Sequence, residues 1–78
     1  MARLRLFGPV REAAGLTADD VAGLTVADVI ASARLRYGAE FTAVACRCRV
    51  WVNGEPAGDE TVVAEGDEVA LLPPVSGG

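Results

Sequence analysis

The chain ends in an apolar strand pattern followed by residues that stop any regular structure. Val69-Ala70-Leu71-Leu72 is apolar on both faces, which predicts a strand at the centre of a sheet. Pro73 and Pro74 follow at once, and because neither can donate a backbone hydrogen bond, the sheet ladder must stop at Leu72. The sequence therefore predicts a fold whose last strand is central and continues into an extended tail, residues 73–78.

The tail finishes with two glycines. Gly77 and Gly78 carry no Cβ, so they can enter a channel too narrow for other residues and leave a terminal carboxylate open to attack. A frayed terminus of small residues would look similar. Because the tail follows a core strand directly, we favour presentation of the Gly78 carboxylate, with Val75 and Ser76 in the spacer between the prolines and the glycines.

The composition indicates one small globular domain, residues 1–78. Hydrophobic residues make up 51% and charged residues 23% of the chain, so it can form a core, although a modest one. No apolar stretch is long enough to span a membrane, and arginines interrupt the N-terminal apolar segment, so we expect neither a signal peptide nor a membrane partner. These features predict a soluble, cytoplasmic protein.

Charge is distributed unevenly. All seven basic residues, every one an arginine, precede residue 50, whereas residues 50–78 hold six acids and no base. Solvated loop charge explains this pattern, but acids near the tail could also steer it toward a basic partner surface. The net charge of −4 and the 5% aromatic content argue against nucleic acid as a partner.

Periodicity predicts the first elements. Arg3 to Phe7 alternates polar and apolar residues, as a strand with one wet face does. A short helix is predicted over Val10–Ala14, closed by Gly15 in the left-handed conformation, and a weak second strand around Asp20–Ala22. Thr25 can cap the clearest helix, with Asp28 in its first turn and Gly38 just past its end. Its predicted core-facing stripe is Val26, Val29, Ile30, Ala33 and Tyr37.

The second half predicts mainly strands. Glu40–Ala45 fits either a short helix or a loop. Cys46–Val52 alternates like a strand, with Cys46 and Cys48 on the core side and Arg47, Arg49 and Trp51 on the other. Asn53-Gly54 predicts a tight turn, followed by a short edge strand within Glu55–Glu60. One dominant helix with several strands predicts an α+β domain.

Three constellations bear on function. Cys46 and Cys48 cannot complete a zinc site without histidine, so we expect small buried residues; a strained disulfide or a metal bridge between subunits is the alternative. Trp51 with Arg47 and Arg49 predicts a partner-binding hot spot beside Leu72, unless the ring packs under its own arginine stems. With no histidine, lysine or phosphate loop, the chain is not expected to be a catalyst by itself.

Two segments resemble one family. Glu65–Gly78 resembles the C-terminus of the molybdopterin synthase small subunit, a MoaD-type sulfur carrier of the ubiquitin-like MoaD/ThiS family, and Leu6–Gly15 resembles its first strand and following short helix. Leu71 and Leu72 stand where many members carry aromatics. The resemblance implies a β-grasp, ubiquitin-like fold: a mixed sheet of about five strands, with one main helix on one face and the first and last strands adjacent.

The resemblance also implies a mechanism. A ubiquitin-activating-enzyme-like adenylyltransferase would use ATP and magnesium to adenylate the Gly78 carboxylate, and a persulfide donor would convert it to a thiocarboxylate. The tail would then enter the large subunit of molybdopterin synthase, in a heterotetramer, and donate sulfur to the molybdopterin dithiolene. The chain itself would bind no cofactor or metal. Alternatives are a carrier for thiamin or cysteine biosynthesis, a protein modifier that forms isopeptide bonds, and a non-catalytic β-grasp interaction domain.

Overall fold

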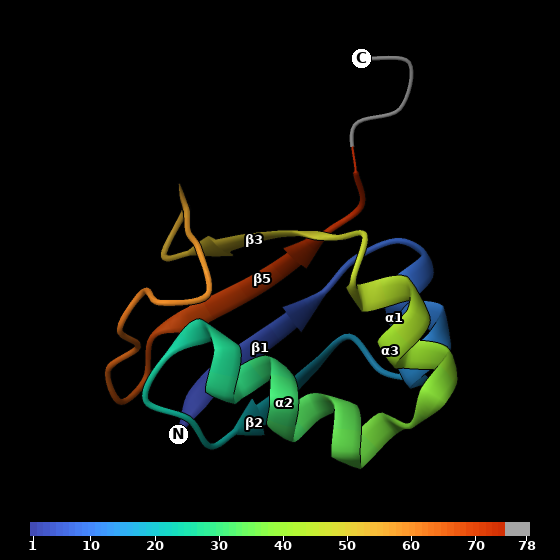
Figure 1. Ribbon diagram of the computed structural model, residues 1–78, viewed down its shortest axis with the longest axis horizontal. Helices are drawn as coiled ribbons and strands as arrows, with labels where there is room; N and C mark the ends of the chain where they lie inside the picture. Colours follow the sequence, from blue (N-terminus) through green and yellow to red (C-terminus); the bar gives the residue numbers. More distant parts are fainter. Residues whose placement is uncertain (75–78) are drawn as a thin grey trace.

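Two parallel strands form the centre of the structure, a computed structural model that describes residues 1–74 (Figure 1). The sheet has the strand order β2-β1-β5-β3-β4, and only the β1–β5 pair is parallel. The elements are β1 (Ala2–Leu6), α1 (Pro9–Ala14), β2 (Ala18–Val21), α2 (Val26–Tyr37), α3 (Ala39–Ala45), β3 (Arg49–Val52), β4 (Glu55–Pro56) and β5 (Glu68–Leu72).

The central position of β5 follows from its side chains. Val69 pairs with Leu4 and Leu71 pairs with Leu6, and all four are fully or almost fully buried. Alternate residues of β5, among them Ala70 and Leu72, point to the other face and are half-buried, and hydrogen-bonded strands lie on both sides of β5. The predictions of a central last strand and of adjacent first and last strands are confirmed.

The main helix, α2, begins and ends close to its predicted bounds. Thr25 Oγ1 accepts a hydrogen bond from the Asp28 backbone N–H at 3.2 Å, which is the expected N-cap contact. Val26, Val29 and Ala33 are buried, and Ile30 and Tyr37 pack partly against the same core. The helix therefore packs on the sheet through the predicted stripe.

A second helix, α3, follows after one glycine. It begins at Ala39 and ends at Ala45, and it buries Phe41 and Ala45. The Phe41 ring meets the Tyr37 ring edge to face, with centroids 5.1 Å apart. This contact resolves the open choice between helix and loop for Glu40–Ala45 in favour of a helix that contributes the largest fully buried side chain of the described residues.

The turns and the weak second strand also form. Gly15 ends α1 in the left-handed conformation, and Asn53 and Gly54 both have positive φ, as a tight hairpin turn requires. Strand β2 lies at Ala18–Val21, two residues earlier at its start than predicted. There Arg36 and Tyr37 of α2 both donate hydrogen bonds to Asp19 Oδ2, and these bonds, that of Tyr37 above all, hold the pKa of Asp19 below its usual range.

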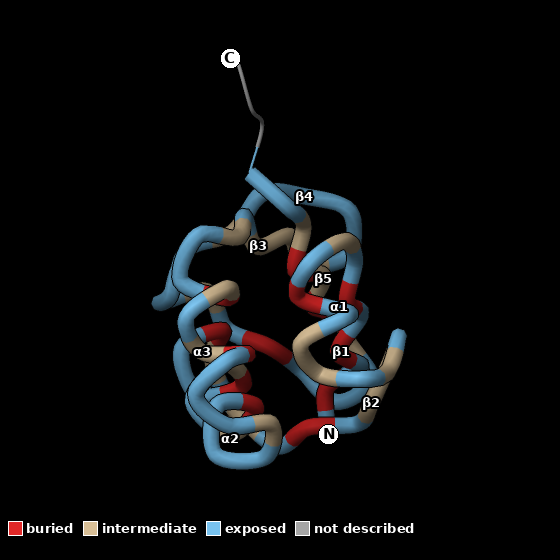
Figure 2. The backbone as a smooth tube through the Cα atoms, turned by 90° about the vertical axis from the view of Figure 1, so that its right-hand side faces the viewer, coloured by how far each residue is buried: buried red, intermediate tan, exposed pale blue. Residues whose placement is uncertain are grey.

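The buried residues gather between the sheet and the helices, as Figure 2 shows in red. The other face of the sheet has no helix over it in the described part of the chain (Figure 1). This architecture confirms the predicted α+β class and the β-grasp, ubiquitin-like arrangement. Among residues 1–74, no helix has the length and apolar character needed to cross a membrane.

Candidate functional site

The uncovered side of the sheet carries a mixed apolar and basic surface. We define the open face as the outward-pointing side chains of the three middle strands: Arg3, Arg5, Glu68, Ala70, Leu72, Arg49 and Trp51. Strand alternation places them there, because each is the neighbour of a side chain directed toward the helices. Its apolar members lie along β5 and β3, next to the point where β5 leads into the tail.

Trp51 lies in a row across this face. Its cross-strand partner on β5 is Ala70, whose partner on β1 is Arg5, and on the edge strand Pro56 stands opposite Trp51. Directly paired residues point to the same side of a sheet, so the half-buried indole lies between a small side chain and a proline ring. The structure thus brings Trp51, Arg49 and Leu72 together, with Arg49 directly opposite Leu72.

Phe7 is an open-face neighbour that the sequence interpretation did not single out. It follows β1, its backbone N–H donates to the Leu71 carbonyl, and the guanidinium of Arg5 lies 5.8 Å from its ring centroid. The Phe7 side chain remains 38% exposed. The signal was present in the alternation of residues 3–7, which puts Phe7 on the same side as Arg3 and Arg5.

Arg47 is not on the open face, which corrects the predicted grouping. The strand predicted from Cys46 begins only at Arg49, because α3 continues into further turns instead. The Cys46 N–H donates to the Thr42 carbonyl at 3.2 Å and the Arg47 N–H to the Val44 carbonyl at 3.1 Å. These bonds hold Arg47 in a turn between α3 and β3, away from the ladder that positions Trp51.

The expected burial of both cysteines is likewise corrected. Cys46 is exposed, in a helical backbone conformation at the end of α3, and Cys48 is half-buried in the turn before β3. Burial, with a smaller effect from the nearby Cys46, raises the pKa of the Cys48 thiol. Neither side chain follows the strand alternation, since neither residue belongs to β3.

Arg47 instead lines a groove at the start of the tail. We define the tail-base groove by its lining residues: Pro9, Ala43, Val44, Arg47, Cys48, Pro73 and Pro74. Its volume is about 390 Å³, and its wall is mostly apolar. Arg47, Pro73 and Pro74 are therefore neighbours, so one predicted partner-binding residue lies beside the tail and the others lie on the open face.

The chain leaves β5 past Gly8, which contacts Pro73 and has a backbone conformation that favours glycine. Gly8 has φ of 63° and ψ of −141°, a region that is essentially restricted to glycine. A Cβ at this position would lie 3.4 Å from Pro73 Cγ and 3.5 Å from Pro73 Cβ. These are ordinary van der Waals distances, so the backbone conformation of Gly8, and not a lack of space, disfavours a side chain at this position.

Replacing Gly8 by alanine is expected to destabilise the protein by about 1–3 kcal/mol, because alanine pays the backbone strain that glycine avoids. Urea unfolding of the variant would measure the loss. Gly58→Ala is the matched control, since Gly58 has open space around it and a φ outside the strained range. Equal stability of the Gly8 variant and the wild type would show that the described backbone is wrong there.

The remaining predicted site residues, Val75, Ser76, Gly77 and Gly78, lie outside the described residues. Within residues 1–74, no group of three or more His, Cys, Asp or Glu side chains is placed to hold a metal ion. The described part of the site is therefore a surface for binding together with the start of a tail.

Comparison with known proteins then places the chain in a family. The family model described as ThiS matches residues 4–78, which is nearly the whole sequence. The chain belongs to the ThiS family. Members of this family are ubiquitin-like sulfur carriers, and the match extends through Gly77 and Gly78. No curated protein matches the sequence of this ThiS-family chain.

Solved structures agree with the family fold. Small archaeal modifier protein 1 (SAMP1) from Haloferax volcanii is 32% identical, with 99% of this chain and 98% of that chain covered and a TM-score of 0.76. SAMP1 from Methanosarcina acetivorans is 30% identical, with 99% and 95% covered and a TM-score of 0.86. One chain from a complex of subunits 1 and 2 of the molybdopterin-converting factor from Helicobacter pylori shares the fold at 24% identity. The match covers 99% of this chain and 97% of that chain, with a TM-score of 0.71.

Proposed function

We propose that this ThiS-family chain is a sulfur carrier whose Gly78 carboxylate is the reactive group. An activating enzyme transfers AMP from ATP, with magnesium, to the carboxylate and releases pyrophosphate. The terminal sulfur of a persulfide donor then displaces AMP and forms an acyl disulfide. A second thiol of the donor cleaves this disulfide, which releases the Gly78 thiocarboxylate and leaves the donor oxidised to a disulfide. The observation that carries this proposal is the family match, which extends through Gly78. It is supported by β5, which ends at Leu72 and leads directly into Pro73 and Pro74.

Our more specific proposal is that the chain is the small subunit of a molybdopterin synthase. Its thiocarboxylate would donate sulfur to form the molybdopterin dithiolene inside the large subunit, in a heterotetramer. The resemblance of Glu65–Gly78 to that subunit supports this assignment, and the shared fold with a subunit of the H. pylori complex is consistent with it. A carrier for thiamin or cysteine biosynthesis would use the same carboxyl chemistry.

The folded body has a clear role in such a mechanism. Residues 73–78, fully extended, span about 20 Å, which allows Gly78 to reach a buried catalytic centre while the sheet stays outside. Ordering six residues costs on the order of 6–12 kcal/mol of conformational entropy. Contacts of the tail alone could hardly offset that cost. We therefore assign most of the docking energy to the open face, with Trp51 as its largest side chain.

Trp51→Ala is expected to lower the rate of Gly78 activation at subsaturating carrier concentration by about 30-fold, equivalent to a hot-spot loss of about 2 kcal/mol. Pyrophosphate release by the activating enzyme would measure it. Leu35→Ala is the matched control. Leu35 is also apolar and is 90% exposed, but it lies on α2, away from the open face of the sheet. If both variants react like the wild type, the open face does not supply the docking energy.

Intact-mass measurement tests the proposed function directly. The protein is incubated with ATP, magnesium, a cognate activating enzyme and a sulfur source. A gain of about 16 Da, from replacement of one oxygen by sulfur, is expected. No gain, with an activating enzyme that is active on another carrier, would refute the carrier function.

A second candidate function is protein modification through an isopeptide bond. The likeness to SAMP1, a modifier protein by name, at 30% and 32% identity favours it as the runner-up. The same activated Gly78 carboxylate would then be attacked by a lysine amine of another protein, with release of AMP. Covalent conjugates of the chain that survive reduction and denaturation would support this candidate, and their absence alongside the 16 Da gain would favour the sulfur carrier.

A further inference from the structure

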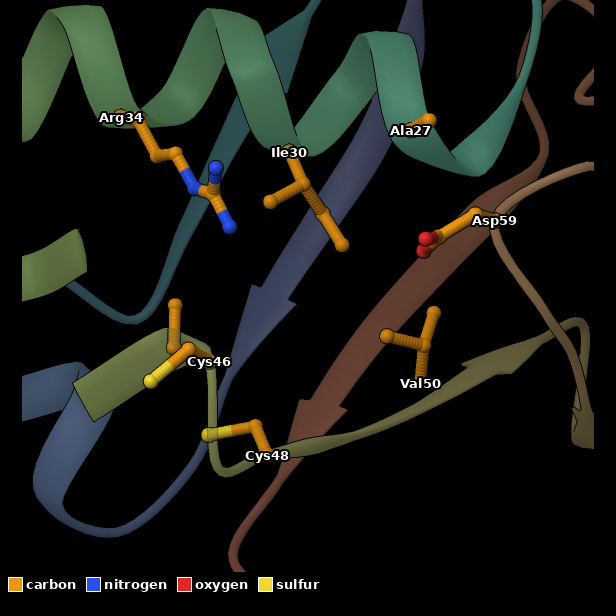
Figure 3. Close-up of a pocket in the computed structure, with 8 residues that line it drawn as sticks. Ala27, Ile30, Arg34, Cys46, Cys48, Val50 and Asp59 are labelled. Carbon is orange, nitrogen blue, oxygen red and sulfur yellow. The ribbon is translucent and has the colours of Figure 1, made fainter. Parts of the chain in front are cut away.

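The turn between α3 and β3 places two thiols on one cleft that the proposed function does not use. Figure 3 shows Cys46 and Cys48 there, with Ile30 and Arg34 of α2 on one wall and Val50 of β3 on another. The cleft has a volume of about 270 Å³. Both cysteines are free, Cys46 exposed and Cys48 half-buried.

The two sulfurs lie on the same side of this turn. The Arg47 N–H donates to the Val44 carbonyl and the Cys48 N–H to the Ala45 carbonyl at 3.0 Å, so the chain turns before it enters β3. Side chains two residues apart in a regular helix do not face each other, but the chain bends at Cys48, and Figure 3 shows both Sγ atoms directed to the same side. The acceptors of the two thiols, the Ala43 and Val44 carbonyls, are consecutive in α3. A bond between the two sulfurs therefore requires a movement of this turn and no rearrangement of the sheet.

The two thiols differ in ways that assign them different roles. Cys46 is open to solvent, and its Sγ donates only a weak hydrogen bond, at 3.0 Å, to the Ala43 carbonyl. Cys48 Sγ is more enclosed and donates to the Val44 carbonyl at 3.5 Å. Burial raises the pKa of the Cys48 thiol, so a larger fraction of this thiol is protonated than of a free cysteine at the same pH. Cys46 is therefore the thiol that an external reagent meets first.

The charges around the cleft indicate which reagent fits. The Arg34 guanidinium points into the cleft from α2 on the side of Cys46, whereas the Asp59 carboxylate lies at the end away from the cysteines, between Ala27 and Val50 (Figure 3). Arg47, although it lies between the two cysteines in the sequence, lines the tail-base groove and not this cleft, so Arg34 is the positive charge of the cleft. A small disulfide that carries carboxylates, as glutathione disulfide does, would be attracted to the cysteine end.

We propose that Cys46 and Cys48 form a reversible thiol–disulfide site, in the turn between α3 and β3, that reacts with small anionic disulfides. The Cys46 thiolate attacks one sulfur of the reagent, forms a mixed disulfide and releases one thiolate. The Cys48 thiolate then attacks Cys46 Sγ, closes the intramolecular bridge and releases the second thiolate. Two protons leave the protein, which is oxidised by two electrons while the reagent is reduced to two thiols.

The site adjoins the base of the tail. Cys48 lines both this cleft and the tail-base groove, and Arg47, enclosed by the bridge, lines the groove beside Pro73 and Pro74. Closing the bridge ties Cys46 to Cys48 and so restricts the turn that carries Arg47. Oxidation is thus placed to alter the groove from which the tail starts.

Glutathione disulfide is the probe for the test. The full chain is incubated with it, quenched with acid, alkylated at the remaining thiols and weighed intact. We expect a species about 2 Da lighter than the dithiol and unreactive to the alkylating agent, while Cys48→Ser stops at a mixed disulfide about 305 Da heavier. Cys46→Ser is expected to react at least about 10-fold more slowly, because the enclosed thiol must attack first. Stable mixed disulfides or disulfide-linked dimers of the wild type, without the lighter species, would overturn the proposal.

Arg34→Gln tests the preference for anionic reagents. It is expected to slow the reaction with glutathione disulfide by about 3-fold and to leave the reaction with neutral 2-hydroxyethyl disulfide unchanged. Equal rates for the variant and the wild type with both reagents would remove Arg34 from the site. Because the readout needs no activating enzyme, failure here is separate from failure of the proposed carrier function.

Discussion

One alanine added after Gly78 is expected to abolish the mass gain of about 16 Da completely. The addition converts the Gly78 carboxylate into an amide, which cannot be adenylated, and the new carboxylate stands beside a Cβ in place of the bare glycine. The measurement is the same incubation with ATP, magnesium, activating enzyme and sulfur source that tests the wild type. An undiminished gain on the extended chain would show that the reaction does not depend on a terminal Gly77-Gly78 carboxylate.

The control for this variant is one alanine added before Met1. The Met1 amine pairs with Glu65, and β1 runs parallel to β5, so this end of the chain lies at the opposite end of the sheet from Pro73 (Figure 1). The control is expected to gain mass like the wild type. The pair of variants also separates classes of function, because a plain interaction domain would bind its partner equally well with either addition.

Phe41→Ala is expected to cost about 3–5 kcal/mol of stability, the usual range when a buried aromatic is removed from a core. Phe41 is fully buried on α3, and its ring packs edge to face on Tyr37 of α2, so truncation leaves a cavity between the two helices. A domain of this size has a total stability of about 4–12 kcal/mol. The substitution is therefore expected to remove a large fraction of the stability of the domain.

Urea unfolding followed by far-ultraviolet circular dichroism would measure this loss. Leu35→Ala serves as the control and is expected to change stability by less than about 0.5 kcal/mol, because its side chain leaves the core untouched. A loss below about 1 kcal/mol for Phe41→Ala would mean that α3 is not packed as described.

The sequence by itself determined the elements whose signals are local. Period-two alternation placed β1, a cap residue and an apolar stripe placed α2, and the apolar run before Pro73 placed β5 at the centre of the sheet. Each of these signals arises from residues a few positions apart. The tertiary contacts of β1, α2 and β5 favour the same secondary structure as these local signals. The tail glycines belong to the same category, and their role remains a prediction from sequence and family.

Only the tertiary structure decided what happens between α3 and β3. The alternation of Cys46-Arg47-Cys48-Arg49 fits a strand equally well, but burial of Phe41 and Ala45 against the core favours α3, whose hydrogen bonds then extend to Cys48. Arg47 leaves the open face for this reason, and both thiols leave the core. The packing of Pro73 on Gly8 could not be predicted from the sequence either, because the two residues are 65 positions apart and no local sequence pattern indicates such a contact.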